Sequence, residues 1–389
     1  MRKQWWLITA VIAGCGGSMQ SVNDARPVSE EQDPVRFGRQ MVIQHDCGAC
    51  HGGGQNPAAP GWLKGASSAA DTFLVGPYKT YARNLTPDVN TGIGRYTERQ
   101  LFNALRYGLQ PANAPDAVIT STVPGQGNFP AQPKFMAPSM PWAAWRHMSD
   151  DELSAVVAYL KRGVKPVSNQ VPASEAPPDF WASESTAEKV GPYPAPPYPT
   201  ERETPLANLP ANMKDKVLRG RHLVLSHACG GCHGSIIDPA APDWVGGITK
   251  PQQEWQIGPF KTRPRNLTPD NTTGMGRFSE RQIFNALRFG LRPGETPDVE
   301  ITSMTPGQGN FPVSPKYLAP PMPWPAWRHM ADEDLWAIAA YLKHGVKPFR
   351  NRVADSEGPL DFWASGYTAE RMGPRPAVPF PTANEVGGN

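Results

Sequence analysis

Apolar residues recur at helical spacing in three segments of the first half of the chain. The segments, which predict the main helices, are residues 35–45, 97–107 and 150–162. The middle one has Leu101, Phe102 and Leu105 on its apolar face, Thr97 as N-terminal cap and Gly108 as terminator. Strand signals are few, and the intervening sequence is rich in proline, which predicts loops and extended chain. The expected fold class is therefore all-α.

The ends of the other two helices also carry capping residues. Asp33 is the expected cap of the first helix, and Pro34 suits its first turn. Ser149 and Glu152 form a capping-box pattern at the start of the third. In the second half of the chain Ala331 stands at the position of Ser149, so this cap is expected to be lost.

The pattern returns 182 residues further along the chain, without a gap, from about residue 37 to residue 200. More than half of the paired positions are identical. Repeated stretches are 83–88 with 265–270, 125–130 with 307–312, 140–142 with 322–324, and 179–183 with 361–365. The repeat predicts two tandem domains of one fold.

The repeat also places the boundaries. We expect an export signal at 1–14, a flexible tether at 15–34, a first domain at 35–200, a connector at 201–216, a second domain at 217–382 and a tail at 383–389. Residues 166–200 look like a proline-rich linker, but the matching stretch at 348–382 has no domain after it to connect. We therefore expect these arms to belong to their domains, with Phe180–Trp181 and Phe362–Trp363 packed against the globular body.

The first residues resemble an export signal. Arg2 and Lys3 precede a short apolar stretch that ends in Ile-Ala-Gly-Cys at residues 12–15. This resembles a lipobox, which implies cleavage before Cys15 and lipidation of its thiol; a plain signal peptide with an incidental Cys15 is the alternative. No apolar run approaches the roughly 20 residues of a membrane-spanning helix. The net charge of +3 argues against nucleic acid as a partner.

Four of the five cysteines form two Cys-x-x-Cys-His sequences, the attachment pattern of c-type haem. The residues are Cys47, Cys50 and His51 in the first copy and Cys229, Cys232 and His233 in the second. Two thiols on one turn can form thioethers with the porphyrin vinyl groups, and the adjacent histidine can then ligate the iron. A redox disulfide or a shared Cys₄ zinc site are alternatives, but neither explains a histidine after both pairs.

Candidates for the second axial ligand must occur in both copies. Met136 and Met304 fail this requirement, whereas four pairs meet it: Met140 with Met322, Met148 with Met330, His147 with His329, and His45 with His227. Prolines on both sides of Met140 and Met322 stiffen their segments, which favours this pair. Bis-histidine ligation through His147 and His329 is the main rival, Met148 and Met330 suit helix staples, and His45 and His227 are expected on the surface.

Other residues are softer candidates. The guanidinium groups of Arg83, Arg95, Arg265 and Arg277 suit haem propionates, with surface or loop-stapling roles as the alternative. Walls of the haem pocket are expected from Trp62, Trp142, Trp244 and Trp324.

Residues 84–88, 91–95, 140–142 and 151–160, with their copies in the second half, are similar to class I cytochromes c of the alcohol and gluconate dehydrogenase cytochrome-subunit type. That resemblance implies His51 with Met140, and His233 with Met322, as axial ligands. Two features depart from the family: this chain has two haem motifs rather than three, and long insertions occupy 111–138 and 293–320. We expect each insertion to cover a haem edge or to meet a partner.

Together these features predict an exported, lipid-anchored protein facing the periplasm, with two covalently bound haem c groups. It would not be an enzyme itself but would relay single electrons between redox proteins, such as a dehydrogenase or a terminal oxidase. A dihaem peroxidase is the alternative, although both copies carry the same Met-Pro-Trp segment and offer no asymmetric open site. A zinc-stabilised structural lipoprotein is a third possibility, and cysteine-ligated haem is disfavoured because no thiol remains.

Overall fold

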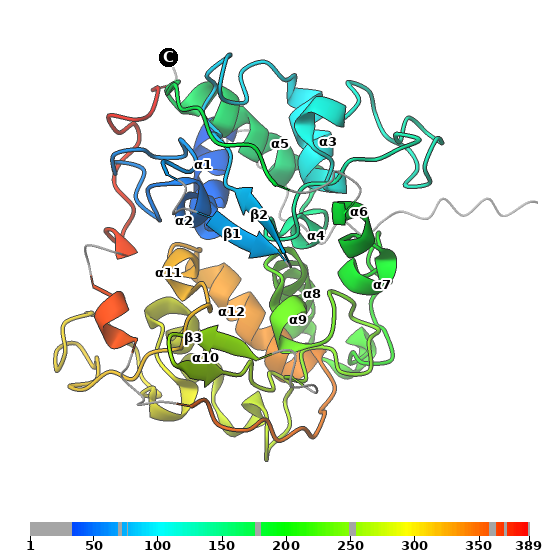
Figure 1. The fold of residues 1–389 in the computed structure, drawn as a ribbon. Helices are drawn as coiled ribbons and strands as arrows, with labels where there is room; N and C mark the ends of the chain where they lie inside the picture. Colours follow the sequence, from blue (N-terminus) through cyan, green and yellow to red (C-terminus); the bar gives the residue numbers. More distant parts are fainter. Residues whose placement is uncertain are drawn as a thin grey trace, which may run out of the picture.

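The computed structural model describes residues 33–68, 72–75, 77–175, 180–248, 254–357, 363–368 and 372–387. The predicted export signal, Cys15, most of the predicted tether and Phe362 lie outside these residues. The architecture consists of two halves whose main helices and hairpins follow the same order, drawn one above the other in Figure 1.

The first half contains the following elements: α1 (Pro34–Gln44), α2 (Cys47–His51), β1 (Thr72–Val75), β2 (Tyr78–Tyr81), α3 (Glu98–Tyr107), η1 (Pro111–Asn113), α4 (Trp142–Trp145), α5 (Asp150–Ala158), η2 (Tyr159–Gly163), α6 (Phe180–Glu184) and α7 (Ala187–Val190). The second half contains η3 (Leu206–Asn208), α8 (Ala211–Ser226), α9 (Cys229–His233), β3 (Trp255–Ile257), β4 (Phe260–Thr262), η5 (Met275–Arg277), α10 (Glu280–Phe289), η6 (Pro293–Glu295), α11 (Trp324–Trp327), α12 (Asp332–Ala340), η7 (Tyr341–Gly345) and η8 (Ala364–Gly366). Most of the regular secondary structure is helical, as predicted. The all-α expectation missed one short antiparallel hairpin in each half, β1–β2 and β3–β4.

The helices begin at the predicted caps. The Asp33 carboxylate accepts a hydrogen bond from the Val35 amide at 2.9 Å, and Pro34 occupies the first turn of α1. Thr97 and Ser149 each form a full capping box. Ala331 begins α12 with no side-chain cap, as the sequence indicated.

The third helix ends differently from the prediction. It is α-helical only to Ala158 and finishes in a π-helical turn, η2, that the sequence pattern did not reveal; α12 finishes in the same way in η7. These turns carry Tyr159 and Tyr341, both fully buried.

Each half is built around a helix pair: α1 packs against α5, and α8 packs against α12. The two halves share one apolar core. Between them the rings of His45 and His227 stack with centroids 4.1 Å apart, and each meets a tryptophan edge-on, Trp145 or Trp327. The expectation that these histidines lie on the surface is wrong, because both are half-buried and stack on each other at the contact between the halves.

Charged side chains join the halves beside this stack. Arg219 Nε lies 3.0 Å from a carboxylate oxygen of Asp334, and its Nη1 lies 3.4 Å from Glu152. His222 Nε2 lies 2.8 Å from the other Glu152 oxygen. Burial alone would raise the pKa of Glu152, but His222, the Ser149 amide and Arg219 together hold it below its ordinary value.

The boundaries between the halves differ from the predicted ones. Helix α8 begins at Ala211, inside the predicted connector 201–216, and residues 195–205, the leading segment, already pack on the second half. Residues 377–387, the closing segment, return to the first half, where Glu385 pairs with Val164. Figure 1 shows this closing segment, in red, running from the lower half to the upper one. The predicted tail 383–389 is thus structural in its described part, to residue 387.

The proline-rich arms run along their own halves before they cross. Asn84 Nδ2 donates to the Val167 carbonyl at 2.8 Å, and Asn266 Nδ2 donates to the Phe349 carbonyl at 2.7 Å. Trp181 and Trp363 are buried, as expected for side chains that pack against the body.

Candidate haem-attachment sites

Both Cys-x-x-Cys-His motifs form a single short helix, α2 in the first half and α9 in the second. Each follows a residue in the left-handed conformation, Asp46 (φ 59°) or Ala228 (φ 58°), which turns the chain sharply after the preceding long helix. Cysteines three positions apart on a helix lie on the same face. The local fold therefore presents both thiols of a motif together, with the histidine at the end of the same turn.

The two motif histidines have identical hydrogen bonds. His51 Nδ1 lies 2.6 Å from the Arg83 carbonyl oxygen, and His233 Nδ1 lies 2.6 Å from that of Arg265. A carbonyl only accepts, so Nδ1–H donates and the lone pair of Nε2 is left to face outward from that contact. Burial lowers the pKa of both imidazoles, which keeps them in the neutral form that ligates metals.

A tryptophan lies directly behind each motif. A Cβ on Gly48 would come within 2.5 Å of the Trp62 ring and 2.1 Å of the Gly54 oxygen. A Cβ on Gly230 would come within 2.1 Å of the Trp244 ring. Only glycine allows this approach, so Trp62 and Trp244 pack against the attachment loops, residues 46–66 and 228–248. That these tryptophans wall a haem pocket stays a prediction. Trp142 and Trp324 instead pack against Gly108 and Gly290, at the ends of α3 and α10.

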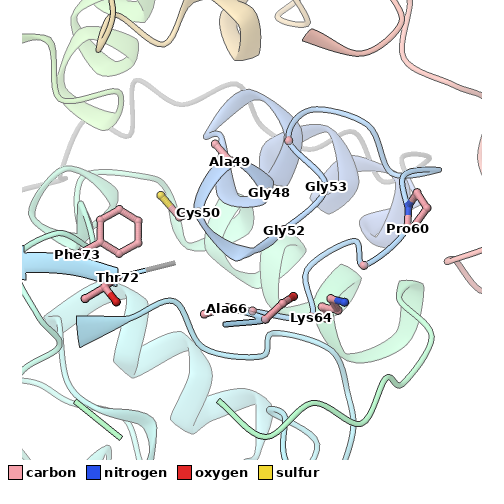
Figure 2. A pocket seen from close by; sticks show the side chains of 14 residues that line it. Gly48, Ala49, Cys50, Gly52, Gly53, Pro60, Lys64, Ala66, Thr72 and Phe73 are labelled. Carbon is pink, nitrogen blue, oxygen red and sulfur yellow. The ribbon is translucent and has the colours of Figure 1, made fainter. Parts of the chain in front are cut away.

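A cavity of about 470 Å³ opens beside the first motif. Figure 2 shows the Cys50 side chain between its own helix and the hairpin strand that carries Thr72 and Phe73, with Lys64 on the opposite wall. The donor set fits covalently attached haem, because a thiol faces open space next to a buried imidazole whose Nδ1 is already engaged.

The alternatives to haem find less support. Burial raises the pKa of Cys47 and of Cys229 to about 12, and it also raises the pKa of Cys50 and Cys232. A redox-active Cys-x-x-Cys pair instead needs a thiol with a lowered pKa. Within the described residues, no group of three or more His, Cys, Asp or Glu side chains is placed to hold a metal ion, which contradicts a shared Cys₄ site.

Met140 and Met322 occupy equivalent turns that lead into α4 and α11. The Met140 amide donates to the Ala137 carbonyl at 2.9 Å, and the Met322 amide donates to that of Ala319 at 3.1 Å. Both side chains are half-buried and pack against the shared apolar core, as does Cys47. Met148 and Met330 are fully within the core, in keeping with the alternative role of helix staples.

His147 and His329 lie near the contact between the halves. His147 has the Tyr193 ring at 6.0 Å, and its pKa is lowered to about 3 by burial and by nearby arginines, including Arg221 of the second half. Nε2 of each histidine is buried without a hydrogen-bond partner among the described residues. The bis-histidine alternative therefore keeps an available nitrogen, but in an arginine-rich environment.

The arginines divide into two groups. Arg83 donates to the Pro172 carbonyl at 2.8 Å, and Arg265 donates to the Val353 carbonyl at 2.8 Å, so both staple the arm to the body. Arg95 and Arg277 are exposed and stack on the rings of the residues that follow them. Contacts to propionates remain a prediction for all four arginines. The backbone carbonyls of Arg83 and Arg265 accept the hydrogen bonds from the motif histidines.

Each insertion forms a small core of its own. Leu109, Ile119 and Phe129 cluster in the first half, and Leu291, Ile301 and Phe311 in the second. Phe135 stacks on Trp142 at 5.9 Å, which fixes the first insertion to the end of α3. Whether the insertions cover a haem edge or meet a partner stays a prediction.

Sequence reasoning missed one set of residues behind the motifs. Trp62 Nε1 donates to the Tyr159 hydroxyl at 2.9 Å, which in turn donates to Glu385 at 2.5 Å. The copy in the second half joins Trp244, Tyr341 and Glu203. The available signal was the 182-residue spacing of Glu203 and Glu385, just beyond the last paired positions considered.

Comparison with known proteins agrees with these motifs. Residues 35–163 match the family model described as cytochrome c. The gluconate 2-dehydrogenase cytochrome c subunit of Pantoea cypripedii is 28% identical over 340 residues, which cover 79% of this chain and 59% of the relative. The alcohol dehydrogenase (quinone) cytochrome c subunit of Gluconacetobacter polyoxogenes is 27% identical over 87% of this chain and 62% of the relative. The fructose dehydrogenase cytochrome subunit of Gluconobacter japonicus is 25% identical over 73% of this chain and 50% of the relative.

The match thus spans about half to three-fifths of the length of these relatives. In the part of the chain that the structure describes, no helix is both long enough and apolar enough to cross a membrane.

Proposed function

Residues 35–163 are a cytochrome c domain of a chain related to dehydrogenase cytochrome c subunits, and from this premise we propose that the whole chain is an electron carrier with one haem c in each half. The observation that carries the proposal is the repeated motif geometry. In both halves two thiols share one helical turn, and a buried histidine donates through Nδ1 to a backbone carbonyl at 2.6 Å. The second cytochrome c domain would comprise about residues 195–375.

Each motif would hold its haem in the same way. Cys47 and Cys50, or Cys229 and Cys232, would form the thioethers, and His51 or His233 would supply Nε2 to the iron. Met140 and Met322 are proposed as the opposite ligands. Haem iron with one histidine and one methionine ligand exchanges one electron, and the methionine sulfur favours the ferrous state.

The protein groups around each motif keep that chemistry in place. The Arg83 and Arg265 carbonyls fix the tautomer and the ring orientation of the histidines. The prolines beside Met140 and Met322 limit the movement of the opposite ligand. Two such centres in one chain would pass electrons singly from a donor to an acceptor.

The donor class follows from the relatives. Three of them are named as cytochrome subunits of gluconate, alcohol and fructose dehydrogenases. We infer that this chain accepts electrons from a dehydrogenase that oxidises an alcohol or a sugar. Export and lipid anchoring at Cys15 would place it at a membrane facing the periplasm.

A redox titration followed by visible and near-infrared magnetic circular dichroism tests the proposal. We expect two covalent haems per chain, both low-spin with histidine–methionine signatures. Met140→Ala and Met322→Ala should each abolish one signature and open that site to cyanide. Met136→Leu, which copies Leu318 of the second half, is the matched control and should leave both signatures unchanged.

Two results would contradict the proposal. A protein without covalent haem would exclude an electron carrier of this type. Rapid binding of cyanide or peroxide by the unsubstituted protein would favour a peroxidase. A low-spin haem with unchanged potential in Met140→Ala would retain the carrier function but move the ligand to another residue, with His147 as the first candidate.

A further inference from the structure

Two buried carboxylates occupy equivalent places in the two halves but arrive from opposite directions along the chain. Glu203 is 0% exposed and precedes its half, 18 residues before Arg221, with which it pairs at 2.7 Å. Glu385 is 2% exposed and comes 346 residues after Arg39, with which it pairs at 2.6 Å. The first half thus obtains its buried carboxylate, Glu385, from the closing segment, and the second half obtains Glu203 from the leading segment.

The carboxylate of Glu385 is connected to the first motif through two side chains. It accepts from Tyr159, and Tyr159 accepts from Trp62 Nε1. The Trp62 ring lies against Gly48, between the two motif cysteines. All the polar atoms in this chain of contacts are buried, so the loss of one partner leaves another unsatisfied.

The closing segment also contacts the attachment loop directly. Thr382 Oγ1 donates to the Pro57 carbonyl at 3.0 Å. Asn384 Nδ2 donates to the Pro57 and Ala59 carbonyls, both at 2.9 Å. Pro57 and Ala59 lie between the motif and Trp62, so the closing segment contacts this loop directly as well as through Glu385.

The second half reproduces the arrangement. Glu203 accepts from Tyr341 at 2.6 Å, and Trp244 donates to Tyr341 at 2.8 Å. Thr200 Oγ1 donates to the Pro239 carbonyl at 2.7 Å, as Thr382 does to Pro57. Arg202 takes the position of Asn384, so the direct amide contacts belong to the first half alone.

We propose that Glu385 is a positioning residue for the first haem-attachment loop and Glu203 for the second, so that the closing segment of the chain completes the first haem site. The inference rests on the proposed haem in each half. Neither carboxylate touches the motif itself, and each acts through tyrosine and tryptophan.

Hydrogen–deuterium exchange on the full-length holoprotein tests the inference, because residues 46–66 and 228–248 differ in sequence and give separate peptides. Glu385→Gln should accelerate exchange about tenfold in 46–66 and leave 228–248 unchanged, as expected for a lost charged hydrogen bond. Glu203→Gln, the matched variant, should do the reverse. In the redox titration each variant should shift one of the two haem potentials, and the two variants should shift different ones.

A second variant keeps the test informative if Glu385→Gln folds poorly. Asn384→Ala retains the carboxylate and removes only the two amide contacts, so a smaller acceleration confined to the peptide around 55–62 is expected. Equal acceleration of both loops by Glu385→Gln, or an unchanged first loop, would overturn the inference. A haem content other than two would refute the proposed function. The exchange rates of the two loops could still be compared in that case.

Discussion

The imidazole of each motif is held by a hydrogen bond to a single backbone oxygen. His51 and His233 donate to the carbonyl oxygens of Arg83 and Arg265, and no side-chain substitution removes those acceptors directly. The guanidinium groups of the same arginines hold the arm. One residue therefore fixes both the imidazole and the segment that covers it.

The glycines within the motifs offer a test at this level. Gly230→Ala should push Trp244 away from the attachment loop, because the added Cβ would lie 2.1 Å from the ring. We expect a loss of about 1–3 kcal/mol in the free energy of unfolding, typical of overpacking. Gly231→Ala is the matched control, since its Cβ meets only ordinary contacts beyond 3.4 Å and the first half has Ala49 there. Equal unfolding free energies for the two variants, from denaturant titration, would show that the close approach is not needed.

Motif residues could be predicted at this scale, whereas their supports could not. The cysteines and the histidine lie close together in the sequence, so the pattern of Cys47, Cys50 and His51 predicts haem attachment without a structure. The acceptor of His51 lies 32 residues away and is a backbone atom, which no side-chain pattern encodes. Glu385 lies 226 residues from Tyr159, and only the fold brings the two together.

The third helix of each half shows which features follow local sequence rules and which depend on tertiary packing. Its start obeys capping rules, with Ser149 and Glu152 in place as predicted. Its end does not, because the final turn widens into η2 and η7, where the tyrosine rings face the buried carboxylates. Hairpins β1–β2 and β3–β4 were missed for a related reason: each strand has only three or four residues, too few for an alternating pattern to be recognised.

The missing cap of α12 gives a prediction for one element. Ala331 has φ −62° and ψ 151°, close to the −66° and 165° of Ser149, so a serine fits without strain. Ala331→Ser should raise the free energy of unfolding by about 0.5–1 kcal/mol through a new bond to the amide of Asp334. Ser149→Ala should lower it by a similar amount. Opposite signs in chemical denaturation would check the assignment, and no change in Ala331→Ser would contradict it.

The contact between the two halves is both apolar and charged. The repeat predicted two copies of a fold but not how they meet. The charged part of the contact uses positions at which the copies differ, whereas the stacked His45 and His227 are equivalent positions. Arg219 corresponds to Phe37, and His222 corresponds to Gln40. The sequence predicted a tail at 383–389, whereas the buried Glu385 pairs with Arg39 and attaches this part of the chain to the first half.

The stacked histidines between the halves predict a dependence of stability on pH. Burial lowers the pKa of His227 to about 4, and burial together with His227 lowers that of His45 well below its ordinary value of 6.5. Neutral rings therefore favour the folded state, and this stability is complete above pH 6.5 and declines as pH falls toward 4. His227 alone should account for a loss on the order of 1–2 kcal/mol between pH 7 and pH 5, and His45 adds to it.

Urea unfolding at pH 7 and pH 5 would measure this loss, with His227→Phe as the comparison. Phenylalanine keeps a ring in the stack and removes one titrating group, so its pH dependence should be shallower than that of the unsubstituted protein. Identical slopes would place the pH-sensitive groups elsewhere, such as His147 and His329.

The closing segment has a consequence for biogenesis. Ribosomes make residues 33–193 first, yet Arg39 and Tyr159 lack their carboxylate until residue 385 has been made. The second half carries its own carboxylate, Glu203, ahead of α8, so the pairing of Glu203 with Arg221 and Tyr341 needs no residue beyond η7. The half that is synthesised first is therefore the half whose buried ion pair is completed last.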